Sequence, residues 1–224
     1  MTELAGVLWD MDGTLLDSEK LWDVAVRELS LALGGPLTEA TRHALVGAPV
    51  LDSLVTVFRA VGREPTPAEL DEAAAWLEAR VSELMDGPIP WRPGAREALA
   101  AVRAAGVPMA LVTNTNRSIT ELSLNTLGRE WFAATVCGDE VSAPKPAADP
   151  YLRAAELLGV DPSACVAVED SINGSRSAVA AGCVVLVVPC EIVVPPAPGI
   201  VFRDTLIGLT VAELAGRVDR IALG

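Results

Sequence analysis

Short, continuously apolar segments alternate along most of the chain with longer segments whose apolar residues recur at helical spacing. Runs that are apolar on both faces are typical of strands in a buried parallel sheet. The runs that predict strands are residues 4–9, 107–112, 135–137, 165–168, 184–188 and 200–202. The segments with helical spacing between them are residues 94–104, 118–127, 149–158 and 173–181. This alternation predicts an α/β fold with a Rossmann-like, doubly wound parallel sheet.

One region, residues 18–87, interrupts the alternation with helical patterning alone. Its predicted helices are residues 21–33, 38–46, 52–61 and 68–85. Pro67 suits the first turn of the last of these helices. Both ends of the region rejoin the same core, so they must lie close together. We expect a core domain made of residues 1–17 and 88–224, and an inserted α-helical cap domain at 18–87.

Composition and charge narrow the class of protein. The chain has 224 residues, of which 51% are hydrophobic, and a formal net charge of -13. A sizeable core is therefore possible, whereas nucleic acids and anionic membranes, which bind basic surfaces, are not expected partners. No apolar stretch approaches the roughly 20 residues that span a bilayer, and the N-terminus lacks a basic segment, so we expect a cytoplasmic protein. No strong interface signal is present, and we expect a monomer.

The cysteines and the histidine give little sign of a metal site. Cys137, Cys165, Cys183 and Cys190 lack C-x-x-C spacing, and His43 lies far from them in the sequence. This spacing argues against zinc and favours buried, reduced thiols in a cytosolic core. A lone histidine is weak evidence of function, so His43 is interpreted as a surface residue of the helical region.

Carboxylates follow the first and the fourth predicted strand. Asp10 and Asp12 come directly after the first strand, and Glu169 and Asp170 follow the fourth. Ligands of parallel α/β sheets bind beyond the carboxyl ends of the strands, so we expect these side chains at one edge of the sheet. Adjacent buried acids need a compensating cation, and Mg²⁺ is often bound by one or two carboxylates together with a phosphate. Asp10, Asp170 and a backbone carbonyl would make such a site.

Three further polar residues are candidates for the same edge. Thr113 and Asn114 end the second strand, where a hydroxyl and an amide suit an oxyanion but equally suit the start of the next helix. Lys145 lies between Pro144 and Pro146, and the proline after it disfavours a helical backbone. It is either a lysine held in a rigid loop or a solvated surface lysine. Together with the acids, these residues form a chemically coherent set.

The combination resembles a known family. Residues 9–18, Trp-Asp-Met-Asp-Gly-Thr-Leu-Leu-Asp-Ser, resemble the first motif of the haloacid dehalogenase-like hydrolase superfamily. The matches to its second, third and fourth motifs are, in order, Thr113, Lys145 with Pro146, and Glu169-Asp170-Ser171. The resemblance spans nearly the whole chain. The helical insert after the first motif is similar to the cap of the subfamily that contains phosphoglycolate phosphatases and β-phosphoglucomutases.

The resemblance implies a magnesium-dependent phosphatase that acts on a small phosphorylated metabolite, such as a sugar phosphate. Asp10 would be the nucleophile that accepts the phosphoryl group, and Asp12 the general acid and then the general base. Asp170 would bind Mg²⁺ directly, Glu169 directly or through water, and Asp12 through its backbone carbonyl. Dehalogenase and phosphonatase members lack an acid at the position of Asp12, so its presence favours a phosphate ester as the substrate.

The remaining motif residues would contact the phosphoryl group. The resemblance implies that Thr113 donates to a phosphoryl oxygen, with Asn114 beside it as a candidate substrate-binding residue. Lys145 would offset the charge of the nucleophile and of the transferring group. The family also implies a cis peptide bond between Lys145 and Pro146.

Substrate choice is expected to lie in the helical region, where the chain departs from the β-phosphoglucomutases. A simple alignment places Trp22 where those enzymes carry a histidine, and Val50, which follows Gly47 in the same loop, where they carry an arginine. Trp22, Gly47 and Val50 are candidate substrate-binding residues, and Trp22 is equally a candidate for packing within the cap. Together with Leu51 they suggest a less cationic cap face and a smaller or less charged substrate.

Two alternatives to a phosphatase stay open. The first is a hexose-phosphate mutase, which must bind two phosphates; the changes in the cap disfavour this activity. The second is a non-catalytic protein of the same fold, which would usually have lost one of the motif acids. Active sites that exclude water close over their substrate. We expect the cap to move about hinges at residues 15–18 and 87–90.

Overall fold

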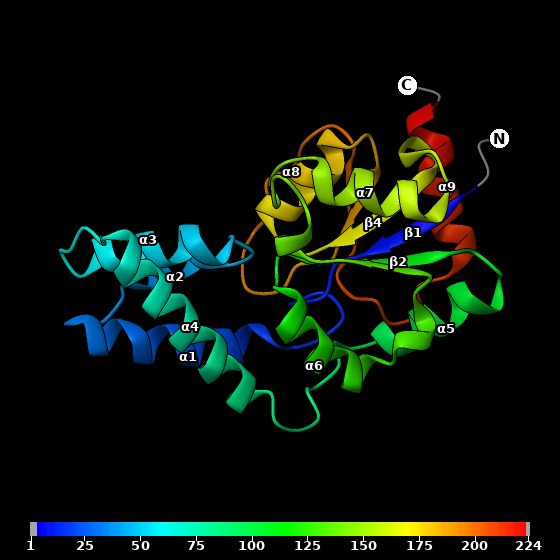
Figure 1. The fold of residues 1–224 in the computed structure, drawn as a ribbon. Helices are drawn as coiled ribbons and strands as arrows, with labels where there is room; N and C mark the ends of the chain where they lie inside the picture. Colours follow the sequence, from blue (N-terminus) through cyan, green and yellow to red (C-terminus); the bar gives the residue numbers. More distant parts are fainter. Residues whose placement is uncertain (1–3, 223–224) are drawn as a thin grey trace.

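The computed structural model describes the backbone of residues 4–222 and the side chains of residues 4–216. Within them, six strands form one sheet in the order β3-β2-β1-β4-β5-β6, and all neighbouring strands are parallel (Figure 1). The strands are β1 (Gly6–Trp9), β2 (Met109–Val112), β3 (Ala134–Val136), β4 (Cys165–Glu169), β5 (Val184–Val187) and β6 (Ile200–Phe202). All the predicted strands and the predicted parallel sheet are confirmed, with strand ends shifted by at most two residues.

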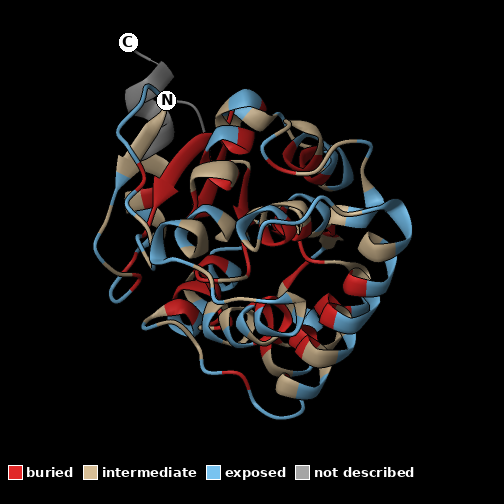
Figure 2. Cartoon of the chain, turned by 90° about the vertical axis from the view of Figure 1, so that its left-hand side faces the viewer, coloured by how far each residue is buried: buried red, intermediate tan, exposed pale blue. Residues whose placement is uncertain are grey.

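Alternate residues of the strands point to opposite faces of the sheet, and each face has its own apolar core. Trp9 and Leu111 belong to the core on one face, whereas Leu8 and Ala110 belong to the core on the other. The helices on the first face are α5 (Ala95–Ala104), α6 (Arg117–Leu127) and α9 (Val211–Ala222), and those on the second are α7 (Asp149–Leu158) and α8 (Ile172–Ala180). Figure 2 shows the buried residues concentrated in the strands and on the inward sides of the helices.

Four helices lie between β1 and α5 in the sequence, and the described residues contain no strand among them. This helical insert consists of α1 (Glu19–Leu33), α2 (Glu39–Leu45), α3 (Val50–Ala60) and α4 (Pro67–Leu84), and it stands beside the carboxyl ends of the central strands (Figure 1). Pro67 occupies the first turn of α4, as predicted, and Thr66 and Glu69 form a capping box there. No helix in the described part of the chain is both long and apolar enough to cross a membrane.

The two segments that connect the insert to the core run side by side. The backbone N–H of Asp17 donates to the carbonyl of Pro90, and that of Arg92 donates to the carbonyl of Leu15, both at 2.8 Å. The expectation that the two ends of the insert lie close together is therefore correct. These paired segments overlap the two stretches that the sequence analysis named as hinges.

The cysteines are free thiols, as the sequence analysis expected. Cys137, Cys165 and Cys183 are buried, and Cys190 is half-buried. Burial raises the pKa of each thiol to about 12. Because the thiolate is the reactive form of cysteine, these side chains serve packing in the core.

Candidate active site

The carboxyl ends of β1 and β4 bring three acidic side chains together. Asp10 directly follows β1, Glu169 ends β4, and Asp170 comes next. The two strands are neighbours in the sheet, and the backbone N–H of Asp10 donates to the carbonyl of Val168 at 3.0 Å. All three side chains are buried, and one oxygen from each carboxylate lies within 4.8 Å of the others. The structure thus gathers the acids that the sequence analysis placed at this edge.

Lys145 supplies the positive charge in the middle of this cluster. Its Nζ donates to Asp10 Oδ1 at 2.7 Å, to Glu169 Oε1 at 2.6 Å and to the carbonyl of Val112 at 2.9 Å. Only 2% of the side chain is exposed, which excludes the solvated surface lysine that the sequence left open. Burial alone would lower the pKa of Lys145, but the charges of Asp10 and Glu169 outweigh it and raise the pKa above its usual value. The lysine is therefore a fixed cation.

The loop that carries Lys145 is anchored by Asn114. The Asn114 side chain accepts from the backbone N–H of Lys145 at 2.8 Å and donates to the carbonyl of Lys145 at 3.1 Å. The Lys145–Pro146 peptide bond is cis, as expected. Asn114 thus positions the loop, a role that neither of the two sequence interpretations of this residue included.

The cluster also contains unsatisfied buried oxygens. Oδ2 of Asp10 and Oδ2 of Asp170 have no hydrogen-bond partner in the described part of the chain. Burial and, after it, the charge of Glu169 outweigh the opposing charge of Lys145 and raise the pKa of Asp10 to about 7. Burial, followed by the charge of Asp10, raises the pKa of Asp170 well above its usual range. Unpaired buried carboxylates are costly, and a divalent cation between them would satisfy both oxygens. These residues therefore fit Mg²⁺, which takes oxygen ligands.

Glu169 differs from the other two acids because both of its oxygens already have partners. Oε1 accepts from Lys145 and from the hydroxyl of Tyr151 at 2.5 Å, while Oε2 accepts from the backbone N–H of Asp170 at 3.3 Å and from Ser171 at 3.2 Å. Burial, followed by the charge of Glu169, raises the pKa of Tyr151 well above its usual value, so its hydroxyl stays a donor. The sequence analysis did not identify Tyr151.

Gly13 allows the first strand's loop to pass close to Asp170. Its φ of +81° lies in the region that favours glycine, and a Cβ added there would be 2.1 Å from Oδ2 of Asp170. The glycine of the first motif therefore keeps open the space beside the unsatisfied carboxylate oxygen.

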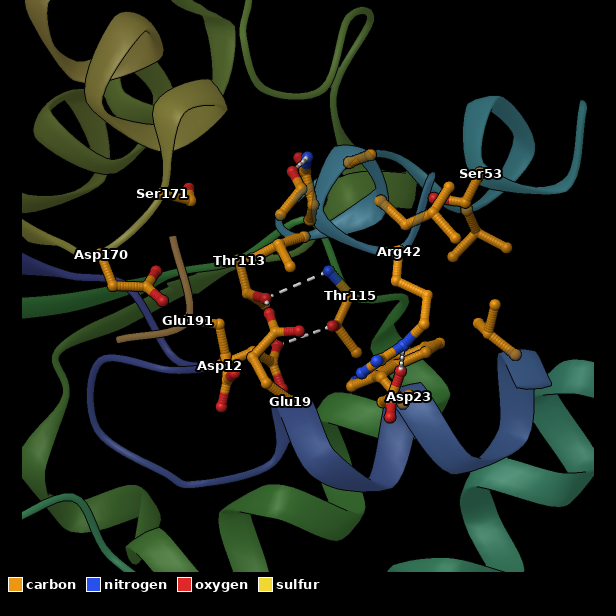
Figure 3. Close-up of a pocket in the computed structure, with 18 of the residues that line it drawn as sticks. Asp12, Glu19, Asp23, Arg42, Ser53, Thr113, Thr115, Asp170, Ser171 and Glu191 are labelled. Atoms are coloured by element: carbon orange, nitrogen blue, oxygen red, sulfur yellow. Dashed lines mark hydrogen bonds and ion pairs between the residues drawn. The ribbon is translucent and has the colours of Figure 1, made fainter. Parts of the chain in front are cut away.

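Asp12 is held by three hydroxyl groups rather than by a cation. Ser18 Oγ donates to Asp12 Oδ1 at 2.6 Å. Thr115 Oγ1 and Thr113 Oγ1 donate to Oδ2 at 2.8 and 3.2 Å (Figure 3). Thr113 in turn accepts from the backbone N–H of Thr115 at 3.1 Å. Asp12 is thereby kept apart from the Asp10–Asp170 pair, so the two aspartates of the first motif occupy different environments.

A pocket opens over these groups, between the strand ends and the helical insert. Of the candidate residues, Glu169 and Leu51 do not line it: Glu169 is fully buried beneath it, and Leu51 is exposed elsewhere on the insert. The candidates that do line it are Asp10, Asp12, Trp22, Gly47, Val50, Thr113, Asn114, Lys145 and Asp170. His43 lines it too and is exposed, which agrees with its interpretation as a surface residue.

Two acids that the sequence analysis did not select add to the charge of the pocket. Glu19, at the start of α1, and Glu191, after β5, both line it (Figure 3). Burial raises the pKa of Glu19 well above its usual value, and the charges of Asp12 and Asp10 raise it further. The catalytic side of the pocket is therefore strongly acidic unless a cation binds there.

The insert touches the core directly at Gly47. The carbonyl of Gly47 accepts from the side-chain amides of Asn114 at 3.1 Å and Asn173 at 3.4 Å. Its φ is +67°, and a Cβ added to it would lie 2.7 Å from the Cβ of Ser171. Gly47 thus seats the loop between α2 and α3 against the core.

Comparisons with known proteins agree with this arrangement. The sequence pattern of the haloacid dehalogenase-like hydrolase family matches residues 4–182. Hexitol phosphatase B of Escherichia coli is 32% identical over 189 residues, which cover 84% of this chain and 84% of that protein. A phosphorylated carbohydrates phosphatase of Thermotoga maritima is 33% identical over 181 residues, covering 80% and 82%.

Solved structures show the same fold. The crystal structure of CbbY from Rhodobacter sphaeroides in complex with phosphate has a TM-score of 0.82 and 29% identity, and the match covers 94% of this chain and 99% of that one. A β-phosphoglucomutase from Clostridium difficile has a TM-score of 0.87 at 18% identity, and that match covers 99% and 100%. With its parallel sheet, its family motifs in order and most of its length matched by the family pattern, the chain is a member of the haloacid dehalogenase-like hydrolases.

Proposed function

We propose that the protein is a magnesium-dependent phosphatase that hydrolyses a small phosphorylated metabolite, a sugar phosphate or a similar phosphomonoester, through an aspartyl phosphate on Asp10. One observation carries the proposal, namely the different states of the two carboxylate oxygens of Asp10. Oδ1 accepts a hydrogen bond from Lys145, whereas Oδ2 is buried without a hydrogen-bond partner in the described part of the chain, as is Oδ2 of Asp170. Membership of a hydrolase family whose named relatives include sugar phosphatases supports the reaction class, phosphoric monoester hydrolysis.

In the first step, a carboxylate oxygen of Asp10 forms a bond to phosphorus while the bond between phosphorus and the ester oxygen breaks. The leaving oxygen takes a proton from Asp12. Lys145 stays on Asp10 Oδ1, where its charge favours the ionised nucleophile and the transferring group. Thr113 makes the longest of the hydroxyl contacts to Asp12, 3.2 Å, and would turn its hydroxyl to a phosphoryl oxygen.

In the second step, Asp12 takes a proton from a water molecule, and the water oxygen attacks phosphorus. The bond between Asp10 and phosphorus breaks, which releases inorganic phosphate and regenerates both aspartates. Ser18 and Thr115 hold the Asp12 carboxylate in one orientation through both steps. Asp12 is therefore positioned by neutral donors, which leave it free to gain and lose a proton.

Asp10, Asp170 and the backbone carbonyl of Asp12 would hold Mg²⁺, and Glu169, whose oxygens both have partners, would reach it through water. When bound, the ion supplies positive charge to the phosphoryl oxygens and to the acidic cluster. We also propose that residues 18–87 act as a cap on a core of residues 1–17 and 88–224, hinged at the paired connecting segments. Trp22, Gly47 and Val50 would then face the substrate from the cap side.

Replacing Asp10 with asparagine tests the nucleophile. We expect Asp10→Asn to reduce the Mg²⁺-dependent release of p-nitrophenol from p-nitrophenyl phosphate on the order of a thousandfold or more. Mass spectrometry of acid-quenched wild-type protein should detect a phosphorylated form that the variant lacks. Asp52→Asn, which removes an exposed carboxylate on α3, is the matched control and should keep full activity. Turnover by Asp10→Asn at the wild-type rate would refute the assignment.

Product analysis separates a phosphatase from a mutase. A phosphatase releases one inorganic phosphate for each sugar phosphate consumed. A mutase would yield an isomeric sugar phosphate with little free phosphate, and that result would exclude hydrolysis as the main reaction.

A further inference from the structure

Beyond Glu19 and Lys20 at the start of α1, the side of the pocket formed by the insert is mostly apolar, with one ion pair in it. Trp22 and Val26 of α1, and Val50 of α3, contribute to the apolar wall. Asp23 of α1 and Arg42 of α2 are the pair. The sequence analysis selected neither residue, and both lie apart from the four family motifs.

Arg42 is the partly buried cation of the pocket that retains unused donors. Lys145 is engaged by Asp10 and Glu169, and the exposed Lys20 pairs with Asp17 at 2.6 Å. Arg42 donates to Asp23 Oδ1 through Nε alone (Figure 3). Its two terminal nitrogens have no partner among the described side chains and backbone groups, although the side chain is only 25% exposed. A guanidinium fixed at one nitrogen and free at the other two is oriented to donate to oxygens of a bound molecule.

Asp23 explains why Arg42 holds its position. Oδ1 of Asp23 contacts Arg42, and Oδ2 forms an ion pair with Arg27 at 2.9 Å, one helical turn along α1. Arg27 does not line the pocket. The carboxylate therefore orients Arg42 and offsets part of its charge, because it is shared with Arg27 outside the pocket.

The charge of the pocket limits what this pair can recognise. Asp10, Asp12, Glu19, Asp170 and Glu191 line the catalytic side, and Lys145 with one divalent cation would offset only part of them. A second phosphate on the substrate would bring further negative charge toward these carboxylates, and toward a guanidinium whose charge the adjacent Asp23 already offsets in part. Hydroxyl groups suit the pair better, because Arg42 can donate to them and Asp23 can accept from them. The neighbouring apolar and aromatic wall suits the carbon skeleton of such a molecule.

We infer that Arg42, oriented by Asp23, is the specificity residue of the pocket, and that it recognises the hydroxyl groups of a polyhydroxylated monophosphate, a sugar or sugar-alcohol phosphate without a second anionic group. This inference rests on the proposed phosphatase function and names the substrate class of that same site. Arg42 binds the end of the substrate that does not react, so its removal acts on KM for polyhydroxylated substrates and spares the chemical step.

The test compares Arg42→Met with Arg27→Met on three substrates: sorbitol 6-phosphate, fructose 1,6-bisphosphate and p-nitrophenyl phosphate. For Arg42→Met we expect KM for sorbitol 6-phosphate to rise about 10- to 100-fold, the effect of losing one or two charge-assisted hydrogen bonds. Its kcat for that substrate, and its kcat/KM for p-nitrophenyl phosphate, should stay within about threefold of wild type, because neither depends on the lost bonds. Arg27→Met removes the other guanidinium on Asp23 and should change none of these constants.

Wild-type protein should also prefer sorbitol 6-phosphate to fructose 1,6-bisphosphate in kcat/KM. A preference for the bisphosphate, or a loss in Arg42→Met confined to the bisphosphate, would overturn the substrate class. An equal loss on p-nitrophenyl phosphate and sorbitol 6-phosphate, or no loss on either, would overturn the role of Arg42. If Arg42→Met is unstable, Arg42→Lys keeps the charge beside Asp23 without the terminal nitrogens and should show the same selective rise in KM. Hydrolysis of p-nitrophenyl phosphate that depends on Asp10 would leave the phosphatase function standing in each of these cases.

Discussion

Replacing Gly47 with alanine tests how the helical insert is seated on the core. Gly47 has a φ of +67° and joins the insert to the core through hydrogen bonds from Asn114 and Asn173. An added Cβ would lie 2.7 Å from the Cβ and 2.8 Å from the Oγ of Ser171. Neither neighbour is the flexible end of a long side chain, so the loop itself has to move. We expect Gly47→Ala to displace the insert from its seat over the pocket.

Two different effects contribute to the loss of stability and activity that we expect in Gly47→Ala. An alanine in the left-handed region costs about 1 kcal/mol of stability wherever it occurs. The displaced loop also weakens two hydrogen bonds worth about 0.5–1.5 kcal/mol each, which disfavours the seated arrangement by about 1–3 kcal/mol in total. The second effect lowers the ratio of the seated to the displaced form by about 5- to 150-fold. Because the pocket is complete only in the seated form, kcat/KM should fall by up to that factor, about tenfold in the middle of the range.

Gly62 provides the matched control for the backbone effect. It also belongs to the insert and has a φ of +78°, but an added Cβ would meet nothing within 4 Å. Gly62→Ala therefore carries the conformational cost without the contact to the core. In urea unfolding, Gly62→Ala should lose about 1 kcal/mol, and Gly47→Ala about 2–4 kcal/mol, because it also weakens the two hydrogen bonds to the core. In a phosphate-release assay, only Gly47→Ala should lose activity.

Equal activity of Gly47→Ala and wild-type protein would refute this reasoning, as would an equal loss of activity in Gly62→Ala. A double variant adds a further check. Ser171→Gly removes the two atoms that an alanine at position 47 would strike, so it should restore part of the activity of Gly47→Ala. It also removes the hydrogen bond that Gly174 N–H donates to Ser171 Oγ at 3.0 Å at the start of α8, so stability should not recover.

Further predictions concern the acids and the lysine of the site. Asp12→Asn should lower kcat for a sugar phosphate by about 10²–10⁴-fold. It should lower kcat for p-nitrophenyl phosphate less, because the p-nitrophenolate leaving group needs less protonation by an acid. Equal losses on the two substrates would contradict the general-acid role. Lys145→Met leaves Asp10 and Glu169 buried without a cation, so urea unfolding at neutral pH should show a loss of about 3–5 kcal/mol, and an unchanged midpoint would count against the charge argument. The pKa of Asp10 is raised from 3.8 to about 7, mainly by burial. Between pH 3.8 and about pH 7 the metal-free native protein therefore binds more protons than the unfolded chain, and its stability falls as the pH rises. Metal-free protein should therefore have a higher Tm at about pH 5 than at about pH 8, and Mg²⁺ should raise Tm more at the higher pH; the reverse order would contradict the burial of an ionisable nucleophile.

The core of the fold could be predicted from the sequence because its strands are buried on both faces. Residues 6–9 of β1 and 165–168 of β4 are apolar, which distinguishes these strands from the amphipathic helices between them. The helix α9 was missed, although Val211 and Leu214 are spaced as on one helical face. It follows the last strand, so the alternation of strands and helices does not require it. Its position is set instead by the burial of Leu214 in the core.

The site was predictable to the extent that it lies in sequence motifs at strand ends. Contacts between distant segments were not predictable, because nothing in the sequence around Ser18 or Thr115 indicates that these side chains donate hydrogen bonds to Asp12. Tyr151 lies on a helix whose apolar spacing indicates ordinary core packing, and only the fold shows its hydroxyl on Glu169. Arg42 belongs to a short helix with no fully buried residue, so its sequence is typical of a solvated surface. The structure places it in the pocket.

The acidity of the pocket has a consequence for the order in which molecules arrive. Phosphate esters are anions, and a pocket with Asp10, Asp12, Glu19, Asp170 and Glu191 around one buried, engaged lysine repels them once these acids are ionised. A divalent cation must therefore enter first and admit the ester, which makes addition ordered rather than random. Free magnesium would then set the fraction of molecules able to take up substrate, and rapid mixing should show a lag when the ester is added to the protein before the ion, but none in the opposite sequence.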